Sequence, residues 1–562
     1  MLLETLRSAR DIGRLHEIAG VLMRYGFSDV VQRLGMQHVL ERAGRVLHWK
    51  DAETLAHLTP PERICSAFQE LGPCYVKLGQ ILATRIDIFP PEWIREFEKL
   101  QDEAPPVPYE DIGKQLAEAF GKPAEEAFAH VERAAFAAAS IAQVHLARME
   151  DGTEVVLKVR RPGIEDVIEA DLHLLSKLAE LAENRLPEAK RYQAKEIVRQ
   201  FTLSLRRELD LASEARNSER IARSFASDPT IVIPRIYWTW TTSVVNVQQY
   251  LKGVRGRDIA GIEQAGLDRK VLAARGAAAV LKMILVDGFY HADPHLGNFF
   301  CLEGNRLGLI DFGMVGRLSE TRRGELVDLL QAIVSRQSYA VTEILLEWSG
   351  EPNVDAEQLA SEVDAFIDSY YGVPLKRIDF AALLTDMMAL VRDHALTWPP
   401  DLSLLIKALI TLEGVGRRLD PDFDMISALT PFVEQAMAER YVPSALAKRG
   451  LSHARDTFDL IAGLPADVRR LLRMARRGAL QINVDVSRLN EFGNTLDRAA
   501  SRVTVGVVTA AIIIGSSIVM STESEREVFG MPMLGFLGFL GACAGGIWLL
   551  FSIWRSGRKH ES

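Results

Sequence analysis

The stretch that decides the interpretation of this chain reads HADPHLGN at residues 291–298 and LIDFG at residues 309–313. Asn298 follows Asp293 by five residues, and Asp311 follows Asn298 by thirteen. Phosphoryl transfer needs a carboxylate beside the entering nucleophile, with an amide and a second carboxylate on the magnesium ion that screens the phosphates. Asp293, Asn298 and Asp311 offer these three groups. A His-rich surface loop before a strand and a turn is the alternative, and residues upstream must decide.

Protein kinases show the same spacing, and they also keep a phosphate-contacting lysine on an upstream strand. In this chain, residues 137–147 lead through Asp151-Gly152 into VVLKV at residues 155–159. An Asp-Gly pair between two apolar runs predicts a strand, a turn and a second strand, which carries Lys158. The alternative is an edge-strand lysine that extends to water. The preceding loop is rich in alanine rather than glycine, so we expect nucleotide affinity or geometry to differ from that of an ordinary kinase.

A charged stretch, RRELDLASEAR at residues 206–216, falls within a predicted helical region from about 165 to 226. On one helix Glu208 and Glu214 would lie about 120° apart, so they cannot both face one lysine. Two separate cations are expected, and Lys158 and Lys77 are the candidates. A solvated helix face with ion pairs is the alternative. Lys77 precedes Gln80 by three residues in GPCYVKLGQ, which places both on one face of a helix.

Composition excludes several classes of protein. The chain has 562 residues, of which 48% are hydrophobic, so it is long enough for more than one domain. Its formal net charge of -9 gives no global attraction to nucleic acid, and no nucleic-acid partner is expected. The four cysteines are widely spaced, which predicts free thiols and no structural zinc. The first residues show mixed charge at helical spacing, so no cleaved signal peptide is expected.

The patterns predict an α+β, two-lobed, protein-kinase-like fold after a helical extension. The extension covers residues 1–108 and ends where prolines at 105, 106 and 108 exclude a helix. The kinase-like domain covers residues 109–460, with a small lobe to about residue 250. Strand-like runs at residues 231–240 and 244–250 lead into a large lobe, in which a long helix spans residues 272–288. Residues 318–460 are mostly helical, with a helix end and restart at residues 411–421. No long activation segment follows residue 313, so a platform for peptide substrates is not expected.

The C-terminal part has a different character. Residues 461–502 include a basic amphipathic helix that favours an anionic lipid surface, with a solvated helix as the alternative. Uncharged runs at residues 503–522 and 528–554 predict a hairpin of two transmembrane helices, rather than a buried hairpin of a soluble core. Basic residues flank the pair, and the connection is acidic, which places the large domain on the cytoplasmic side of the inner membrane.

Together these segments resemble the UbiB family of atypical kinase-like proteins over nearly the whole chain. The resemblance rests on Lys77 to Gln80, the alanine-rich loop, Lys158, Glu208 with Asp210, HADPH at residues 291–295, DFG at residues 311–313 and the terminal hairpin. It implies ATP and Mg²⁺ as cofactors. Ala142, Leu296 and Gln249 depart from the family pattern, which would have glycine, proline and glutamate there. These departures affect loop geometry and adenine contacts, not the charge of the metal site.

The resemblance also implies roles for single residues. Lys158 would contact phosphates and pair with Glu214, and Asp293 would be the catalytic carboxylate. Asn298 and Asp311 would bind magnesium. Glu208 and Asp210 would engage the segment with Lys77 and Gln80, which would fold over the site as a regulatory cover. The nucleotide would be contacted by the alanine-rich loop and by the connection between the lobes: Ala137, Ala138, Ala139, Ser140, Ile141, Ala142, Gln143, Val144, His145, Gln249 and Leu251.

The resemblance finally implies a membrane-anchored, kinase-like ATPase that supports ubiquinone biosynthesis. Its expected partners are an anionic membrane surface and either polyprenyl quinone intermediates or the ubiquinone-biosynthesis enzymes that modify them. Two alternatives stay open. One is a true kinase for a small molecule or protein, and the other is a nucleotide-sensing scaffold without catalysis.

Overall fold

This computed structural model describes residues 9–33, 57–100, 104–350, 354–370, 373, 378–394, 396–441 and a few positions between 507 and 544. The small lobe is built on an antiparallel sheet. Its central hairpin turns at Asp151-Gly152, as the sequence predicts. The strand order is β1-β3-β4-β6, with β2 paired to β3. These strands are β1 (His130–Val131), β2 (Ala137–Ala138), β3 (Ala142–Arg148), β4 (Glu154–Arg160) and β6 (Val245–Gln249).

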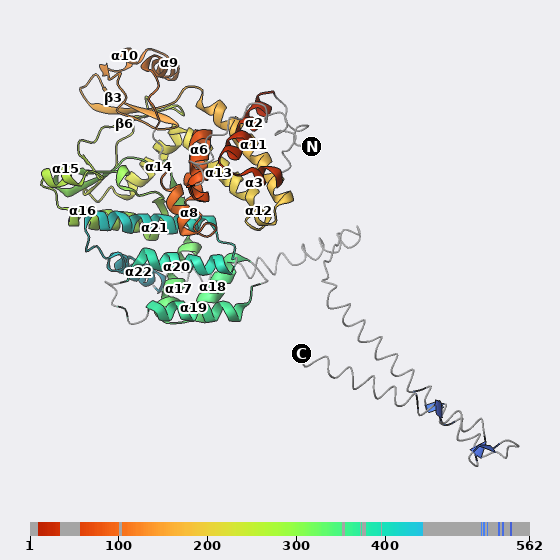
Figure 1. The fold of residues 1–562 in the computed structure, drawn as a ribbon. Coiled ribbons are helices and arrows are strands. Elements are labelled where there is room, and N and C mark those ends of the chain that lie inside the picture. Colours follow the sequence, from red (N-terminus) through yellow and green to blue (C-terminus); the bar gives the residue numbers. More distant parts are fainter. Residues whose placement is uncertain are drawn as a thin grey trace, which may run out of the picture. The chain divides into compact units, whose positions relative to one another are not determined.

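The two faces of this sheet differ in what they contact. Val155, Leu157 and Val159 pack into one apolar core with α9 (Tyr109–Phe120) and α10 (Ala124–Ala127), the two helices above the sheet in Figure 1. Because side chains alternate along a strand, Lys158 faces the opposite side. The hairpin therefore presents its lysine to the rest of the protein and not to the helices that cover the sheet.

The helical stretch after β4 is broken, and the predicted continuous helix is wrong at Asp210. The helices here are α11 (Ile164–Arg185), α12 (Pro187–Arg191), α13 (Ala194–Leu209) and α14 (Leu211–Ser224). Asp210 separates the last two with φ −93° and ψ 92°. Its carboxylate accepts the N–H of Ala212 at 3.1 Å and so caps α14. Glu208 and Glu214 lie on different helices, and the angle expected for a single helix does not apply.

The N-terminal extension is helical and packs against the helices of the small lobe. Its described part comprises α2 (Ala9–Arg24), α3 (Ser28–Arg33), α6 (Pro60–Leu71), α7 (Pro73–Leu82) and α8 (Pro91–Phe97). Leu15, Phe68 and Tyr75 of the extension share one apolar core with residues of α11 and α13. Residues 104–108 contain no helix or strand, as their prolines predict.

The large lobe contains a four-stranded sheet in the order β5-β10-β9-β7 and a small β11-β8 sheet. The prediction of a strand over residues 231–240 is largely wrong, because Pro234 interrupts it. The two residues that do form β5 pair with β10 of the large lobe. The strands are β5 (Ile231–Val232), β7 (Val254–Arg255), β8 (Phe289–His291), β9 (Phe299–Leu302), β10 (Arg306–Leu309) and β11 (Val315–Arg317).

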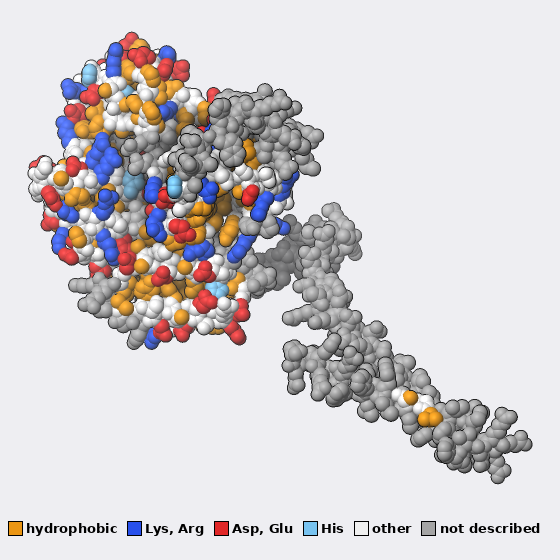
Figure 2. All heavy atoms as spheres, viewed as in Figure 1, with side chains coloured by type: hydrophobic (Ala, Val, Ile, Leu, Met, Phe, Trp, Pro, Cys, Tyr) orange, Lys and Arg blue, Asp and Glu red, His pale blue; other side chains and the backbone are white. Residues whose placement is uncertain are grey.

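A helix leads directly into the deciding stretch. α16 (Arg269–Leu281) continues as the π-helix η1 (Lys282–Asp287) and stops at Gly288, whose φ is 63°. The 3-10 turns η2 (Leu296–Asn298) and η3 (Glu303–Asn305) flank β9. The other helices among the described residues of this lobe are α15 (Ile259–Gln264), α17 (Glu320–Val334), α18 (Ser338–Ser349), α19 (Ala356–Tyr370), α20 (Phe380–Asp393), α21 (Pro400–Leu419) and α22 (Met425–Tyr441). On the face shown in Figure 2, acidic and basic side chains are interspersed over the described residues.

Residues Lys448–Ser562 form a second unit. Its described part includes the short antiparallel pair β12 (Glu527–Val528) and β13 (Met531–Pro532). The predicted basic region at residues 461–502 and most of the predicted spans at residues 503–522 and 528–554 lie outside the described residues. Within the described part of the chain, no helix combines the length and the apolar character that a bilayer crossing requires.

Candidate active site

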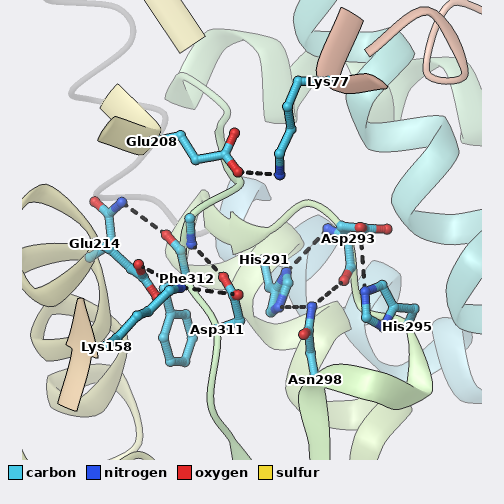
Figure 3. A network of polar contacts seen from close by, with 12 residues as sticks. Lys77, Lys158, Glu208, Glu214, His291, Asp293, His295, Asn298, Asp311 and Phe312 are labelled. Atoms are coloured by element: carbon cyan, nitrogen blue, oxygen red, sulfur yellow. Dashed lines mark hydrogen bonds and ion pairs between the residues drawn. The ribbon is translucent and has the colours of Figure 1, made fainter. Parts of the chain in front are cut away.

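Lys158 lies where the two lobes meet, between a glutamate of the small lobe and an aspartate of the large lobe (Figure 3). Its Nζ donates to Glu214 Oε1 at 2.8 Å and Oε2 at 2.9 Å, and to Asp311 Oδ2 at 3.4 Å. Glu214 is 5% exposed on α14, whereas the Asp311 side chain is 41% exposed. The structure thus brings together three of the residues that the sequence singled out, and it pairs Lys158 with Glu214.

Lys158 is paired with two carboxylates, and this arrangement together with burial shifts the pKa values of Lys158, Glu214 and Asp311. Burial opposes the charged form of Lys158, but Asp311 and Glu214 outweigh it and raise the pKa of Lys158 above its ordinary value. Burial raises the pKa of Glu214 to about 7 despite the nearby lysine. Burial also opposes ionisation of Asp311, yet Lys158 and the N–H of Gly313 hold the pKa of Asp311 below its usual range. Lys158 is therefore cationic and Asp311 anionic at neutral pH.

His291 orders the loop that carries the predicted catalytic carboxylate. It is 1% exposed at the end of β8, and its Nδ1 accepts the N–H of Asp293 at 3.1 Å. Its Nε2 lies 3.4 Å from the Asn298 amide, and its ring lies beside Phe312 with centroids 5.8 Å apart. Burial lowers the pKa of His291 against the pull of Asp311 and Asp293. A neutral His291 thus contacts the main chain of Asp293, the predicted metal ligand Asn298, and Phe312, which follows the predicted metal ligand Asp311.

Asp293 has a cation on one side and a histidine on the other. Its Oδ1 lies 3.6 Å from Lys407 Nζ, and its Oδ2 lies 3.7 Å from His295 Nε2. Burial raises the pKa of Asp293, but Lys407, His295 and His291 together hold it below its usual value. The side chain is 29% exposed. Asp293 is therefore an ionised carboxylate that a small reactant can reach.

Asn298 and Asp311 offer oxygen ligands that suit a magnesium ion. The Nδ2 of Asn298 donates to the main-chain oxygen of Asp293 at 3.2 Å, which leaves Oδ1 for a cation. Asp311 Oδ1 accepts the N–H of Gly313 at 2.8 Å. Among the described residues, no group of three or more His, Cys, Asp and Glu side chains has the arrangement of a metal site. One amide and one carboxylate still fit Mg²⁺, which takes its other ligands from water and nucleotide phosphates.

The N-terminal extension reaches the site through α7. Lys77 forms an ion pair with Glu208 at the end of α13, above Asp311 and His291 in Figure 3. Lys77 also lies close enough to Asp311 to lower its pKa. Gln80 Nε2 donates to the main-chain oxygen of Leu100 at 3.0 Å, which ties α7 to the segment after α8. Asp210, the fourth predicted regulatory residue, caps α14 and forms an ion pair with Arg216 at 2.9 Å.

A second set of contacts attaches the extension to the large lobe. The Asp87 side chain is 3% exposed and forms an ion pair with Arg85 at 2.7 Å. The same carboxylate accepts a hydrogen bond from Ser403 of α21 at 3.0 Å. Arg392 of α20 donates to the main-chain oxygen of Ile86 at 3.0 Å. The segment between α7 and α8 is thus bound to two helices of the large lobe.

The alanine-rich loop forms a tight corner of the small-lobe sheet. Ala137 and Ala138 make up β2 and pair with Val144 and Gln143 of β3. The N–H of Ala139 donates to the oxygen of Ala142 at 2.8 Å. Ser140 and Ile141 are buried at this corner, and Ile141 joins the core of the extension. Val144 lies opposite Lys158 in the β3–β4 register and shares its face, so it is the β3 side chain best placed to meet a nucleotide.

Gln143 and His145 face away from Lys158, so the expected nucleotide contact of these two side chains needs correction. Gln143 accepts the N–H of Val107 at 2.8 Å and donates to the Val107 oxygen at 3.2 Å. His145 Nδ1 lies 2.8 Å from the oxygen of Glu132, and its Nε2 lies 2.9 Å from Gln143 Nε2. The alternation of β3 causes this, because residues 143 and 145 share one face and residues 142 and 144 share the other. The two side chains anchor the proline-rich segment instead.

The connection between the lobes contains the last two predicted nucleotide contacts. Gln249 is exposed at the end of β6, where its main-chain N–H donates to Arg235 at 2.8 Å. Leu251 is 7% exposed and packs with Phe300 and Leu302 of the large lobe. Both positions border the lobe boundary, and Leu251 attaches the connection to β9.

Sequence reasoning missed Lys407 and Asn217. Lys407 is a single lysine in the apolar run LLIKALI at residues 404–410, and that isolation is the signal by which the sequence could have indicated it. Asn217 of α14 donates to the main-chain oxygen of Phe312 at 3.1 Å and so holds the DFG segment against the small lobe. No sequence signal distinguishes Asn217 from any other polar residue of a surface helix.

Comparison with known proteins identifies the family. Residues 99–345 match the ABC1 atypical kinase-like domain, residues 363–424 match the UbiB helical domain, and residues 487–555 match the ABC1/UbiB kinase-like C-terminal domain. A protein of Xylella fastidiosa named "Probable protein kinase UbiB" is 31% identical, with 97% of this chain and 99% of the relative covered. The chain belongs to the UbiB family.

A relative from another organism gives the same result. A "Probable protein kinase UbiB" of Pseudomonas aeruginosa is 35% identical, with 77% of this chain and 83% of that protein covered. A solved structure of Mycobacterium tuberculosis, the Rv3197–erythromycin complex, is 23% identical with a TM-score of 0.46, and the match covers 64% of this chain and 92% of that one. The match of the UbiB-family chain to the ABC1 atypical kinase-like domain agrees with its predicted kinase-like combination of helices and sheets.

Proposed function

We propose that this UbiB-family protein binds ATP with Mg²⁺ between its lobes and uses it for hydrolysis or phosphoryl transfer in support of ubiquinone biosynthesis. One observation carries the proposal: Lys158 Nζ lies 2.8 Å from Glu214 and 3.4 Å from Asp311. In protein kinases, the strand lysine, its helix glutamate and the DFG aspartate must be in place together before phosphoryl transfer occurs.

Each residue of the site then has a chemical role. Lys158 contacts the nucleotide phosphates, and Glu214 fixes its direction. Asn298 and Asp311 hold the magnesium ion, which supplies positive charge for the phosphates when bound. Asp293 accepts the proton of the entering hydroxyl or water, because it is ionised and partly exposed. His291 keeps Asp293 in place through its main-chain N–H.

The cover formed by α7 and α8 favours a small acceptor. Lys77 is paired with Glu208 above the DFG segment, and Asp87 binds the cover to α21. The family resemblance implies that this cover blocks the space that a protein substrate would use. Water or a small molecule remains compatible with the geometry, which favours ATP hydrolysis over protein phosphorylation.

The proposal also concerns the membrane and the biosynthetic pathway. Support comes from the uncharged runs at residues 503–522 and 528–554, from the basic region before them and from the name UbiB of the relatives. We expect the protein to lie at the inner membrane and to act on polyprenyl quinone intermediates or on the enzymes that modify them. Anionic liposomes should bind more protein than neutral ones and raise ATP turnover. Equal binding and unchanged turnover would contradict this part.

The test of the chemistry is Mg²⁺-dependent ATP turnover by the full-length protein. Asp293→Asn should lower turnover about 100-fold or more, since a positioned base contributes that much. Asp364→Asn, at an exposed position of α19, is the matched control. Free phosphate as the product supports an ATPase, and label from the γ-phosphate in another stable product supports the kinase alternative. Lack of Mg²⁺-dependent ATP binding would disprove the proposal.

The test of the pathway is a quinone profile of cells that lack the protein. An early prenylated precursor should accumulate, and the wild-type chain should restore the quinone while Asp293→Asn should not. Restoration by Asp293→Asn but not by Asp311→Asn would instead favour a nucleotide-sensing scaffold.

A further inference from the structure

Lys407 is a nearly buried lysine in an apolar helix. It lies on α21, where Leu405, Ile406 and Ala408 around it are buried, and its own side chain is 12% exposed. Lysine is rarely buried unless it is paired, because removing its charge from water costs free energy. The position of Lys407 therefore calls for an anionic partner.

The contacts of Lys407 with the described residues leave most of its N–H donors available. Its Nζ lies 3.6 Å from Asp293 Oδ1, which is an ion pair but not a hydrogen bond of ordinary length. The described residues offer this ammonium no other ion pair within 4.0 Å. An ammonium has three N–H donors. Lys407 therefore has donors to offer a further anion beside Asp293.

The other cations near the site are already occupied. Lys158 is shared by Glu214 and Asp311, and Lys77 is paired with Glu208. Glu98, which follows α8 in the cover, lies close enough to Lys407 and Asp293 for both to affect its pKa. Among the described residues, Lys407 is thus the lysine that lies beside Asp293.

The position of Asp293 determines which part of a bound nucleotide would lie near Lys407. A base must lie within about 3 Å of the hydroxyl or water whose proton it takes. That nucleophile attacks the γ-phosphorus, so an ammonium beside Asp293 lies next to the phosphoryl group in transfer. A cation held there stabilises the charge that develops on the phosphoryl oxygens.

We propose that Lys407 binds the γ-phosphate of the nucleotide and is a catalytic residue supplied by the helical domain at residues 363–424. This inference rests on the proposed function, because it needs a nucleotide between the lobes. It assigns to α21 a part in the chemistry, in addition to its packing against α16 and α20. It also divides the phosphate contacts between the lobes: Lys158 comes from the small lobe and Lys407 from the large one.

The experiment compares two nucleotides that differ in the γ-phosphate. Binding of ADP and of a nonhydrolysable ATP analogue is measured with Mg²⁺ on the full-length protein and on its Lys407→Met and Lys407→Arg variants. Lys407→Met should weaken the analogue about tenfold or more, as expected for a lost charge-assisted contact, and change ADP affinity less than twofold. Lys407→Arg should recover most of the loss. Lys270→Met, at a 66% exposed lysine of α16, is the control.

The outcomes separate this inference from the proposed function. Equal weakening of ADP and the analogue, or no weakening of either, would overturn the role of Lys407 and leave Mg²⁺-dependent nucleotide binding intact. Failure of the wild-type protein to bind either nucleotide would overturn the proposed function and this inference with it. Thermal unfolding of each variant shows whether it is folded, and Lys407→Arg keeps the test valid if Lys407→Met is not.

Discussion

Lys77 of the N-terminal extension forms an ion pair with Glu208 at the end of α13, and the two side chains are 12% and 27% exposed. The pair joins α7 to the helix that precedes α14, and α14 carries the partner of Lys158. Only Leu209 and Asp210 therefore separate Glu208, which contacts the cover, from the helix that carries the partner of Lys158.

Removal of this ion pair should loosen the cover. Lys77→Met leaves Glu208 partly buried without its partner, so the main-chain amides of α7 should exchange several-fold faster with deuterium. Hydrogen-exchange mass spectrometry of peptides over residues 73–82 measures the effect. Lys99→Met, at a 65% exposed lysine paired with Glu96, is the control. Unchanged exchange in α7 would show that its packing alone holds the cover.

The contact between Asp87 and Ser403 should contribute measurably to stability. Ser403→Ala removes one donor to a buried carboxylate, and we expect a loss of about 1 kcal/mol in the free energy of unfolding. Denaturant unfolding measures the change, with Ser361→Ala at an exposed position of α19 for comparison. A loss no larger than that of Ser361→Ala would mean that the ion pair with Arg85 satisfies Asp87 by itself.

Gly79 should tolerate a side chain less well than another helical glycine. A Cβ at Gly79 would overlap Leu100 and lie 3.0 Å from Phe68, whereas at Gly113 the nearest atom is 3.9 Å away in Tyr109. Gly79→Ala should destabilise the protein by about 1–3 kcal/mol. Gly113→Ala should stabilise it by about 0.5–1 kcal/mol, because alanine favours the helix. The opposite order of their melting temperatures would contradict the close packing of α7.

His145 should make the stability depend on pH. Burial lowers the pKa of His145 below 6.5, against the hydrogen bond to Glu132. The unfolded chain then takes up a proton near pH 6.5 that the folded protein takes up only at lower pH, so stability falls as the pH decreases from about 7. His145→Gln should flatten the decrease in melting temperature between pH 7.5 and 5.5. His130→Gln, at an exposed position, should leave the decrease as it is.

Local sequence signals predicted much of the site. The Asp-Gly turn placed Lys158 on the second strand of a hairpin. The spacing of Asp293, Asn298 and Asp311 matched that of protein kinases, and in the structure Asp293 and Asn298 lie on one loop while Asp311 follows the β9–β10 hairpin. These features depend on turn chemistry and strand alternation, which act over a few residues. The same alternation, applied to β3, would have turned Gln143 and His145 away from the nucleotide.

The wrong or missing predictions concern features that the local sequence does not determine. Nothing in the run from Arg206 to Arg216 marks the break at Asp210, because aspartate is both a tolerable helix residue and a good N-cap. Lys407 and Asp293 are far apart along the chain and meet only because α21 packs beside the catalytic loop. Such contacts leave no periodic pattern, so they become visible only in the folded protein.

The break at Asp210 has a mechanical consequence. A continuous helix would have fixed Glu208 and Glu214 rigidly to each other, but two short helices that meet at one residue form a joint. Tilting α13 when the cover lifts would pull on the start of α14, and with it on the carboxylate that steers Lys158. Movement of the cover would then be coupled to release of the nucleotide that we propose Lys158 contacts.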